Sequence, residues 1–145
     1  MLYKSFSPKD TCFLAKKIVK QVKSGSVILL IGDLGTGKTT FSQGFAKALG
    51  IKENVGSPTF KVVSEYYSKY LTLYHIDAYR LEGVSDFLNI GGEKYLYPED
   101  GVTLIEWADL INEIFDDDVI KITFEREKGN LQARIIKIEG LNINV

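Results

Sequence analysis

Apolar residues recur at helical spacing in two segments near the start of the chain. The first segment opens with Ser-Pro at 7–8, where serine suits the N-cap and proline suits the first turn, and it stops near Ser-Gly at 24–25. The second segment follows Lys38 and stops at Gly50, a residue type that commonly ends helices. The spacing therefore predicts two amphipathic α-helices.

Two continuously apolar runs predict strands that are buried on both faces. They are "VILLI", Val27–Ile31, between the two helices, and "VTLIE", Val102–Glu106. Strands without polar alternation are typical of parallel sheets, in which helices cover both faces. The two runs therefore favour a parallel central sheet.

Four further strand-like runs come in two pairs with short connections. "FKVVSEYY" (60–67) and "LTLYHIDAY" (71–79) are separated by three residues, and "VIKITFERE" (119–127) and "LQARIIKIE" (131–139) flank a turn at Gly129-Asn130. Short connections of this kind favour antiparallel hairpins.

Short helical pieces are predicted for 85–95, with a break at Gly91-Gly92, and a short helix for "WADLINEIF" at 107–115. No repeat, low-complexity segment or linker divides the sequence. We therefore expect one domain over residues 1–145. Its class is α/β, with a mostly parallel central sheet that is flanked by helices and extended by antiparallel hairpins.

The segment between the first buried strand and the second helix is "GDLGTGKT", Gly32–Thr39, a full match to G-x-x-x-x-G-K-[ST]. Its glycines let successive N–H groups form a nest for anionic oxygens, and the following helix adds its positive dipole end. Lys38 can reach the β- and γ-phosphates of a nucleotide, and the Thr39 hydroxyl can hold Mg²⁺. The motif predicts a P-loop NTPase-like fold with nucleotide contacts from Asp33, Leu34, Gly35, Thr36, Gly37, Lys38, Thr39 and Thr40.

A P-loop site also needs a carboxylate on the Mg²⁺ side, usually at the end of a hydrophobic strand. Glu106 ends "VTLIE", and ligands bind at this carboxyl edge of parallel sheets. We therefore expect Glu106 to act as the metal-side carboxylate, directly or through water. The alternative is a charged residue that only emerges from the sheet.

The stretch "YHIDAYRL" holds the only histidine, His75, two positions before Asp77. Strand alternation puts His75, Asp77 and Tyr79 on one face. If that face meets the phosphate loop, Asp77 would orient the attacking water or a metal-bound water, and His75 would orient Asp77 or pack beside it. In "GSPTF", Thr59 would approach the γ-phosphate, unless this Ser-Pro pair is only a turn before a strand.

Composition narrows the class of protein. The chain is 45% hydrophobic and 26% charged with a net charge of −1, which disfavours a protein that grips nucleic acid by itself. The lysines at 16, 17, 20 and 23 are interpreted as a solvated helix face. Cys12 is the only cysteine, which excludes an internal disulfide or a Cys-rich zinc site. Without a signal-like or membrane-spanning apolar run, we expect a cytoplasmic protein with no membrane contact.

Motifs that the chain lacks narrow the type of nucleotide enzyme. The guanine-specific motif N-K-x-D is absent, which disfavours a GTPase. Small-molecule kinases usually close an arginine-bearing lid over the phosphates, whereas the arginines of this chain, Arg80, Arg126 and Arg134, are not clustered. A slow ATPase that is coupled to a partner protein is favoured. Two alternatives stay open: a small-molecule or nucleoside P-loop kinase, and a module that binds ATP without hydrolysing it.

The motifs "GDLGTGKTTFSQGFAKALGI", "SPTF", "YHIDAYRL" and "IEWAD", in this order and at these separations, resemble the TsaE (YjeE) family over about residues 5–138. The resemblance implies a bacterial P-loop ATPase that uses ATP and Mg²⁺ in the synthesis of threonylcarbamoyladenosine (t6A) in tRNAs that read codons beginning with A. It also implies partnership with the TsaD catalytic subunit and its paralogue TsaB, and contact with tRNA only through that complex.

The resemblance assigns roles by position. Lys38 and Thr39 correspond to the Walker A lysine and the Mg²⁺ ligand, and Glu106 corresponds to the Mg²⁺-side carboxylate. Asp77 stands at the family's essential aspartate in H-x-D-x-Y-R. The resemblance therefore implies Lys38, Asp77 and Glu106 as the catalytic residues.

Trp107 follows Glu106 as a tryptophan does in the family, and we expect it to lie at the nucleotide. Many members have proline at the next position, where this chain has Ala108. The departure concerns contacts to the base and leaves the phosphate chemistry as expected.

Overall fold

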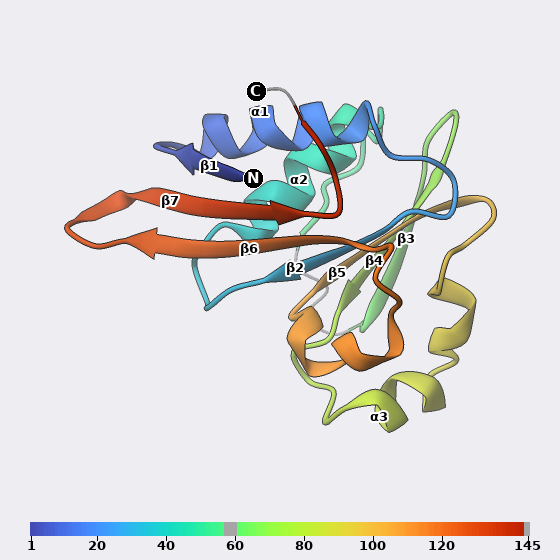
Figure 1. The fold of residues 1–145 in the computed structure, drawn as a ribbon. Coiled ribbons are helices and arrows are strands. Elements are labelled where there is room, and N and C mark those ends of the chain that lie inside the picture. The colour runs from blue at the N-terminus through green and yellow to red at the C-terminus, as the bar shows by residue number, and fades with distance from the viewer. Residues whose placement is uncertain (57–60, 144–145) are drawn as a thin grey trace.

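Seven strands form one sheet in the computed structural model of the chain, which describes residues 1–56 and 61–143. The order across the sheet is β1-β7-β6-β2-β5-β4-β3 (Figure 1). The strands are β1 Leu2–Ser5, β2 Val27–Ile31, β3 Val63–Tyr67, β4 Thr72–Asp77, β5 Gly101–Glu106, β6 Ile120–Glu127 and β7 Asn130–Glu139.

The four strands at the centre of the sheet are parallel. β2 pairs with both β5 and β6, and β5 also pairs with β4, all in parallel register. The pairs β3–β4 and β6–β7 are antiparallel hairpins, as their short connections predict. The predicted α/β class with a parallel centre and antiparallel additions is therefore confirmed.

The edge strand β1 has no counterpart in the sequence-based prediction. It pairs antiparallel with β7, and the N-terminal ammonium of Met1 donates to the carbonyl of Ile138 at 2.9 Å. Only Ser5 among its four residues is buried, so no apolar pattern marks it. Backbone pairing with β7 defines this strand.

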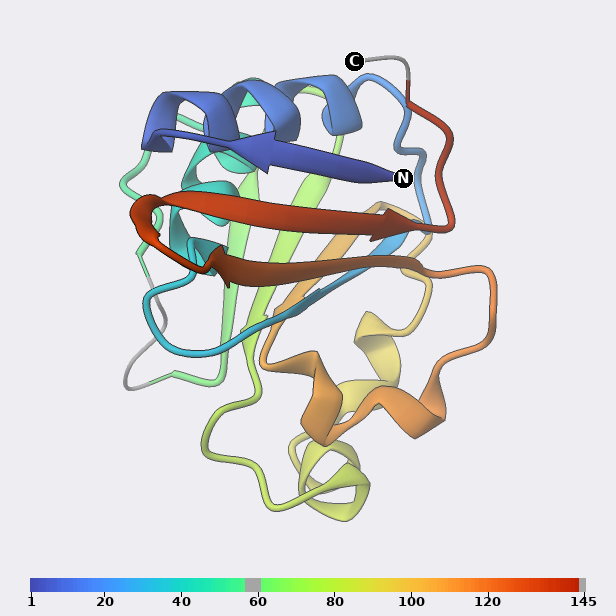
Figure 2. The same cartoon turned by 60° about the vertical axis from the view of Figure 1, so that its left-hand side comes forward.

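Helices cover both faces of the sheet (Figures 1 and 2). α1 and α2 lie side by side on one face, and α3 lies with the 3₁₀ turns on the other. None of the helices in the described ranges is long and apolar enough to cross a membrane. The bounds are α1 Pro8–Val19, α2 Lys38–Ala48, α3 Val84–Asn89, η1 Gly92–Tyr95, η2 Ala108–Leu110 and η3 Asn112–Ile114.

Two helical boundaries differ in detail from the prediction. Segment 107–115 forms two short 3₁₀ turns in place of one helix, because Trp107 takes a left-handed conformation (φ 57°) and Ile111 (φ −133°) interrupts the helical dihedrals. α1 begins as predicted, with the Ser7 hydroxyl accepting from the backbone N–H of Asp10 at 3.2 Å. It ends at Val19, before the apolar periodicity stops.

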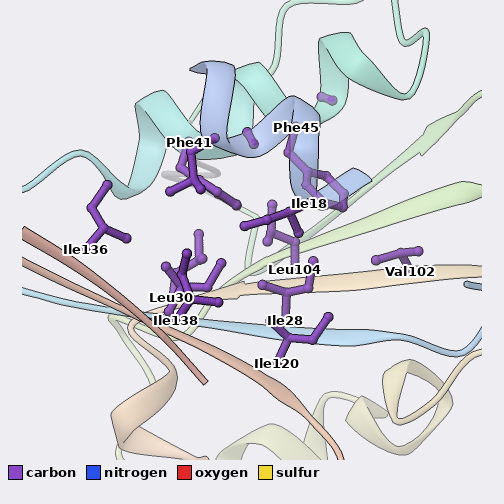
Figure 3. Packing of buried hydrophobic residues seen from close by; sticks show 14 of the residues in the cluster. Ile18, Ile28, Leu30, Phe41, Phe45, Val102, Leu104, Ile120, Ile136 and Ile138 are labelled. Carbon is purple, nitrogen blue, oxygen red and sulfur yellow. The ribbon is translucent and has the colours of Figure 1, made fainter. Parts of the chain in front are cut away.

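Each face of the sheet has its own apolar cluster. On the α1–α2 face, Ile18 and Phe41 pack over Leu30 in a cluster that spans five strands (Figure 3). On the opposite face, Leu29 belongs to a second cluster with the fully buried Phe87 of α3. Leu29 and Leu30 point to opposite faces because side chains alternate along a strand. The continuous apolar run of β2 therefore anchors both layers.

Candidate nucleotide and magnesium site

The carboxyl ends of the parallel strands meet at one edge of the sheet. The phosphate loop follows β2, Asp77 ends β4 and Glu106 ends β5. Asp77 and Glu106 are partners in the parallel register, so their side chains leave the sheet next to each other on one face. Neighbouring carboxylates repel each other unless a cation is close. Ligands bind at this edge in parallel sheets, and here it gathers groups from three strands.

The phosphate loop turns from β2 into α2 through backbone that only glycine adopts readily. Gly37, the N-cap of α2, has φ 109°. A Cβ atom on Gly32 would lie 2.7 Å from the carbonyl oxygen of Phe124, so β6 packs directly against the loop. The loop thereby delivers the chain to the N-terminus of an 11-residue helix, where backbone N–H groups and the helix dipole favour an anion.

Lys38 lies over the loop with its ammonium held by backbone and aromatic groups. Its Nζ donates to the carbonyls of Gly32 and, at 2.9 Å, Asp33, and lies 3.9 Å from the centre of the Trp107 ring. Burial lowers the pKa of Lys38 from its ordinary value, while nearby carboxylates, Glu106 foremost, oppose that shift. The fold therefore brings together Lys38 and Trp107, two predicted nucleotide contacts.

Glu106 is 2% exposed, and its carboxylate makes polar contacts with three side chains. Its Oε1 accepts from the Thr39 hydroxyl at 3.1 Å. Its Oε2 accepts from the Ser42 hydroxyl at 3.3 Å and pairs with Nε2 of His75 at 2.5 Å. These contacts hold the carboxylate between α2 and β4. Because Ser42 and His75 both contact Oε2 of Glu106, its Oε1 is the oxygen on the side of Thr39 and the loop.

The partner of His75 differs from the expected one. The sequence suggests that His75 orients Asp77 or packs beside it, whereas the polar contact of the His75 ring is with Glu106, its diagonal neighbour across the β4–β5 register. The ring is fully buried, and within the described residues its Nδ1 has no hydrogen-bond partner. The buried ring therefore gains its polar contact through Nε2, and the carboxylate that it orients is Glu106.

The oxygens of Thr39 and Glu106 fit two neighbouring places around Mg²⁺. In an octahedral shell with Mg–O distances of about 2.1 Å, adjacent ligand oxygens lie about 3 Å apart, and these two lie 3.1 Å apart. Within the described ranges, no group of three or more His, Cys, Asp or Glu side chains could hold a metal by itself. The donor set suits Mg²⁺, which proteins commonly bind through one or two oxygens together with water and nucleotide phosphates.

Asp77 is half-buried at the same edge. Its Oδ1 accepts from the backbone N–H of Tyr79 at 3.0 Å, which fixes the side chain in a turn directly after β4. Tyr79 lies beyond the strand, and its ring centre is 5.1 Å from that of Trp107. The charge of Asp77 also acts to raise the pKa of Lys38, so Asp77 is within electrostatic reach of the loop.

Two arginines that are separated in the sequence reach the phosphate loop together. Arg126 and Arg134 are cross-strand partners in the β6–β7 hairpin. Arg126 Nη2 donates to the Leu34 carbonyl at 3.0 Å, and Arg134 Nη2 donates to the Gly35 carbonyl at 3.3 Å. The interpretation that the arginines are not clustered is therefore wrong for this pair, because the hairpin register brings them side by side.

A cleft of about 480 Å³ opens at the loop, a volume within the range of small-molecule sites. Part of its wall comes from outside the predicted motifs: Ser5, Ser7 and Thr11 belong to the β1–α1 region and Gln132 to β7. No motif spacing marks these residues, since the pairing of β1 with β7 brings them to the loop. The predicted residues in its wall are Leu34, Gly35, Gly37, Lys38, Thr39, Thr40, Glu106 and Trp107.

Other described residues that were predicted to contact the nucleotide do not line the cleft. Thr36 is buried, and its hydroxyl donates to the Asp33 carbonyl at 2.7 Å, so these two residues shape the turn of the loop. Thr59 lies outside the described residues.

Comparisons with known proteins agree with this geometry. The family profile described as "Threonylcarbamoyl adenosine biosynthesis protein TsaE" matches residues 5–136. The chain is 42% identical over 124 residues to the tRNA threonylcarbamoyladenosine biosynthesis protein TsaE of Bacillus subtilis, which covers 86% of this chain and 77% of that protein. It is 41% identical over 107 residues to the protein of the same name from Treponema pallidum, covering 74% and 78% of the two chains.

A solved structure is similar as well. The crystal structure of YdiB from Bacillus subtilis superposes with a TM-score of 0.78 at 36% sequence identity. The match covers 95% of this chain and 83% of that chain.

Proposed function

The chain belongs to the TsaE family, and we propose that it is a Mg²⁺-dependent subunit that binds and hydrolyses ATP and is required for t6A modification of tRNAs that read codons beginning with A. The observation that carries the proposal is the contact between Thr39, at the start of α2, and Glu106, at the end of β5. It joins the phosphate loop to a strand-end carboxylate, the pairing on which P-loop NTPases depend. The names of the relatives connect the family with t6A biosynthesis.

Each group at the edge of the sheet has a distinct task in this proposal. Lys38 exchanges its backbone carbonyl partners for the β- and γ-phosphate oxygens of ATP. Thr39 and Glu106 would hold Mg²⁺, which would neutralise charge on the phosphates. Asp77, fixed by the backbone N–H of Tyr79, orients the water that attacks the γ-phosphorus. Positioning and charge neutralisation supply most of the catalysis in phosphoryl transfer.

Partner proteins complete the proposed function. TsaD and TsaB are the proposed partners, with tRNA met only through the assembly, in the cytoplasm. The net charge of −1 is consistent with indirect tRNA contact. We expect turnover of the isolated chain to be slow and to change when TsaD and TsaB are added.

The test combines an ATPase assay and a pull-down with TsaD–TsaB. Lys38→Ala and Glu106→Ala are each expected to lower turnover about 100-fold or more, because the first removes a cation from the phosphates and the second removes a proposed ligand of the Mg²⁺ that neutralises them. Lys20→Ala is the matched control, since this exposed lysine of the same layer lies outside the cleft. Unchanged turnover in Lys38→Ala would contradict the site, and components that neither associate nor affect repeated rounds of t6A formation would contradict the partnership.

A kinase activity is the second candidate, and the arginine pair favours including it. Arg126 and Arg134 already contact the loop, so the sequence argument against an arginine-bearing lid does not hold for them. Incubation with ATP and a panel of nucleosides and small metabolites distinguishes the two activities. If a phosphorylated product forms faster than free phosphate, the protein is a kinase and the ATPase assignment is wrong.

A further inference from the structure

Charged residues are distributed unevenly between the two layers that cover the sheet. Residues 1–52 carry nine lysines against two aspartates, and they include α1 and α2. Segments 80–100 and 107–119, which include α3 and the 3₁₀ turns on the opposite face, carry ten acidic residues against two basic ones. The net charge of −1 therefore conceals a basic face and an acidic face.

A groove lies between α1 and α2 on the basic face. It has a volume of about 730 Å³, and carbon-rich side chains, Phe13 and Ala48 among them, form much of its lining. Three exposed lysines, Lys9, Lys16 and Lys47, border it. No carboxylate is found among the described residues that line it. We call this feature the lysine groove.

The shape of the lysine groove follows from how the two helices meet. A Cβ atom on Gly44 would lie 2.9 Å from Cα and 3.0 Å from Sγ of Cys12, so the helices approach closely only because Gly44 has no side chain. Phe13, one residue further along α1, is 53% exposed beside this crossing point. The Lys17 ammonium lies 4.9 Å from the centre of the Phe13 ring and adds positive charge at this end of the lysine groove.

We propose that the lysine groove is a docking site for an acidic amphipathic helix of a partner protein. An apolar floor takes the apolar side of such a helix, and lysines along the border attract carboxylates on its flanks. The floor favours a peptide over RNA, because a phosphate backbone needs polar donors along its path and gains little from burying carbon surface. Since binding needs no nucleotide, the inference does not rest on the proposed ATPase function.

The chain provides its own reporter for this site. Cys12 is the only cysteine, is partly exposed and lines the lysine groove. A bound helix covers its thiol and slows alkylation by iodoacetamide. The probe is a synthetic helix of about 20 residues with Leu on one side and Glu on the other, and the same peptide with Lys in place of Glu is its control.

Two sets of charge reversals separate the lysine groove from the general field of the basic face. The groove triple combines Lys9→Glu, Lys16→Glu and Lys47→Glu. The outer triple changes three exposed lysines of the same layer outside the groove, Lys20→Glu, Lys23→Glu and Lys52→Glu. All six positions are exposed, so both triples are expected to keep the fold, which circular dichroism checks.

The expected result is a selective loss. The acidic peptide slows Cys12 alkylation of the wild type about fivefold or more, and its affinity falls about tenfold or more in the groove triple but within about threefold in the outer triple. Phe13→Ala lowers the affinity about three- to tenfold, because it removes the exposed ring from the floor.

Four results would overturn the inference. Cys12 could be alkylated at the same rate with and without peptide, or both triples could lose affinity equally, which would indicate only a general electrostatic field. A single-stranded RNA that protects Cys12 better than the acidic peptide would assign the groove to nucleic acid. Without peptide, Cys12 could become protected from alkylation as the protein concentration rises. If a variant with the acidic face neutralised loses this protection, the lysine groove would be assigned to a second copy of this chain.

Discussion

On one face of the sheet, the layer of α1 and α2 is rich in lysine, whereas on the other face α3 and the 3₁₀ turns place carboxylates over an apolar cluster. The first face carries the N-terminus of α2, the cleft and the lysine groove. The second face contributes Phe87 and Ile111 to the core. The difference shows that the position of charge, rather than its total, is the informative quantity for a protein of near-zero net charge.

Removal of a core side chain on the acidic face tests whether that face contributes stability without contacting the nucleotide. Phe87→Ala empties the site of a fully buried ring and is expected to lower the free energy of unfolding by about 3–5 kcal/mol. ATP affinity, measured well below the melting temperature, should stay within about twofold. Urea unfolding and calorimetric titration provide the two values. Leu88→Ala, a 40% exposed neighbour on α3, is the control, and a parallel loss of ATP affinity in Phe87→Ala would contradict the separation of the faces.

A change on the basic face should affect nucleotide affinity, unlike Phe87→Ala. His75→Ala removes a partner of Glu106, the proposed Mg²⁺ ligand. It is expected to weaken binding of ATP with Mg²⁺ about 10- to 100-fold, as loss of groups behind a metal ligand commonly does. Binding of ATP without Mg²⁺ should change little, because His75 orients only the carboxylate.

His75→Gln keeps a donor that can reach Glu106 and should restore part of the affinity. Isothermal titration with and without Mg²⁺ measures both variants. Equal weakening in the two conditions would assign His75 a packing role only.

Long-range charge should have a smaller effect. The outer triple is expected to lower ATP affinity about threefold at low ionic strength, and this difference should vanish near roughly 1 M salt, because the field of exposed lysines is screened. The matched reversal on the acidic face changes the exposed residues Glu93→Lys, Glu113→Lys and Asp117→Lys. Tighter ATP binding in that variant, by as much as the outer triple weakens it, would show that both faces act equally on the cleft.

The smallest expected effect is on stability at alkaline pH and comes from Tyr74 on β4. Burial and hydrogen bonds to Asp100 raise the pKa of Tyr74 to about 12. Because the protonated phenol is favoured in the folded state, its contribution to stability is complete below pH 10, the ordinary pKa, and is lost as pH rises through 12. Tyr74→Phe should flatten that part of the stability curve, as followed by urea unfolding at stepwise pH. An unchanged slope would show that other groups control alkaline unfolding.

Local patterns predicted most elements of the fold. β2 coincides with "VILLI", α2 begins at Lys38, and the two hairpins appear where short connections separate strand-like runs. β1 and the 3₁₀ turns after Trp107 were beyond those patterns, since β1 depends on pairing with β7 and the turns depend on one left-handed residue.

The local pattern was enough to predict the phosphate loop, because its glycines and the Lys38-Thr39 pair all lie within one segment, Gly32–Thr39. It also indicated Glu106, because a carboxylate that ends a buried strand comes to a known edge of a parallel sheet. The contact between His75 and Glu106 could not be predicted from local spacing, since the parallel register of β4 and β5 sets which side chains meet.

The arginine pair and the two charged faces were likewise decided by the tertiary structure. Arg126 and Arg134 reach the loop because the β6–β7 hairpin aligns them. The lysine groove exists because α1 crosses α2 at Gly44. Residue spacing within one segment predicts local structure. Contacts between segments depend on strand register and helix packing, which local spacing does not encode.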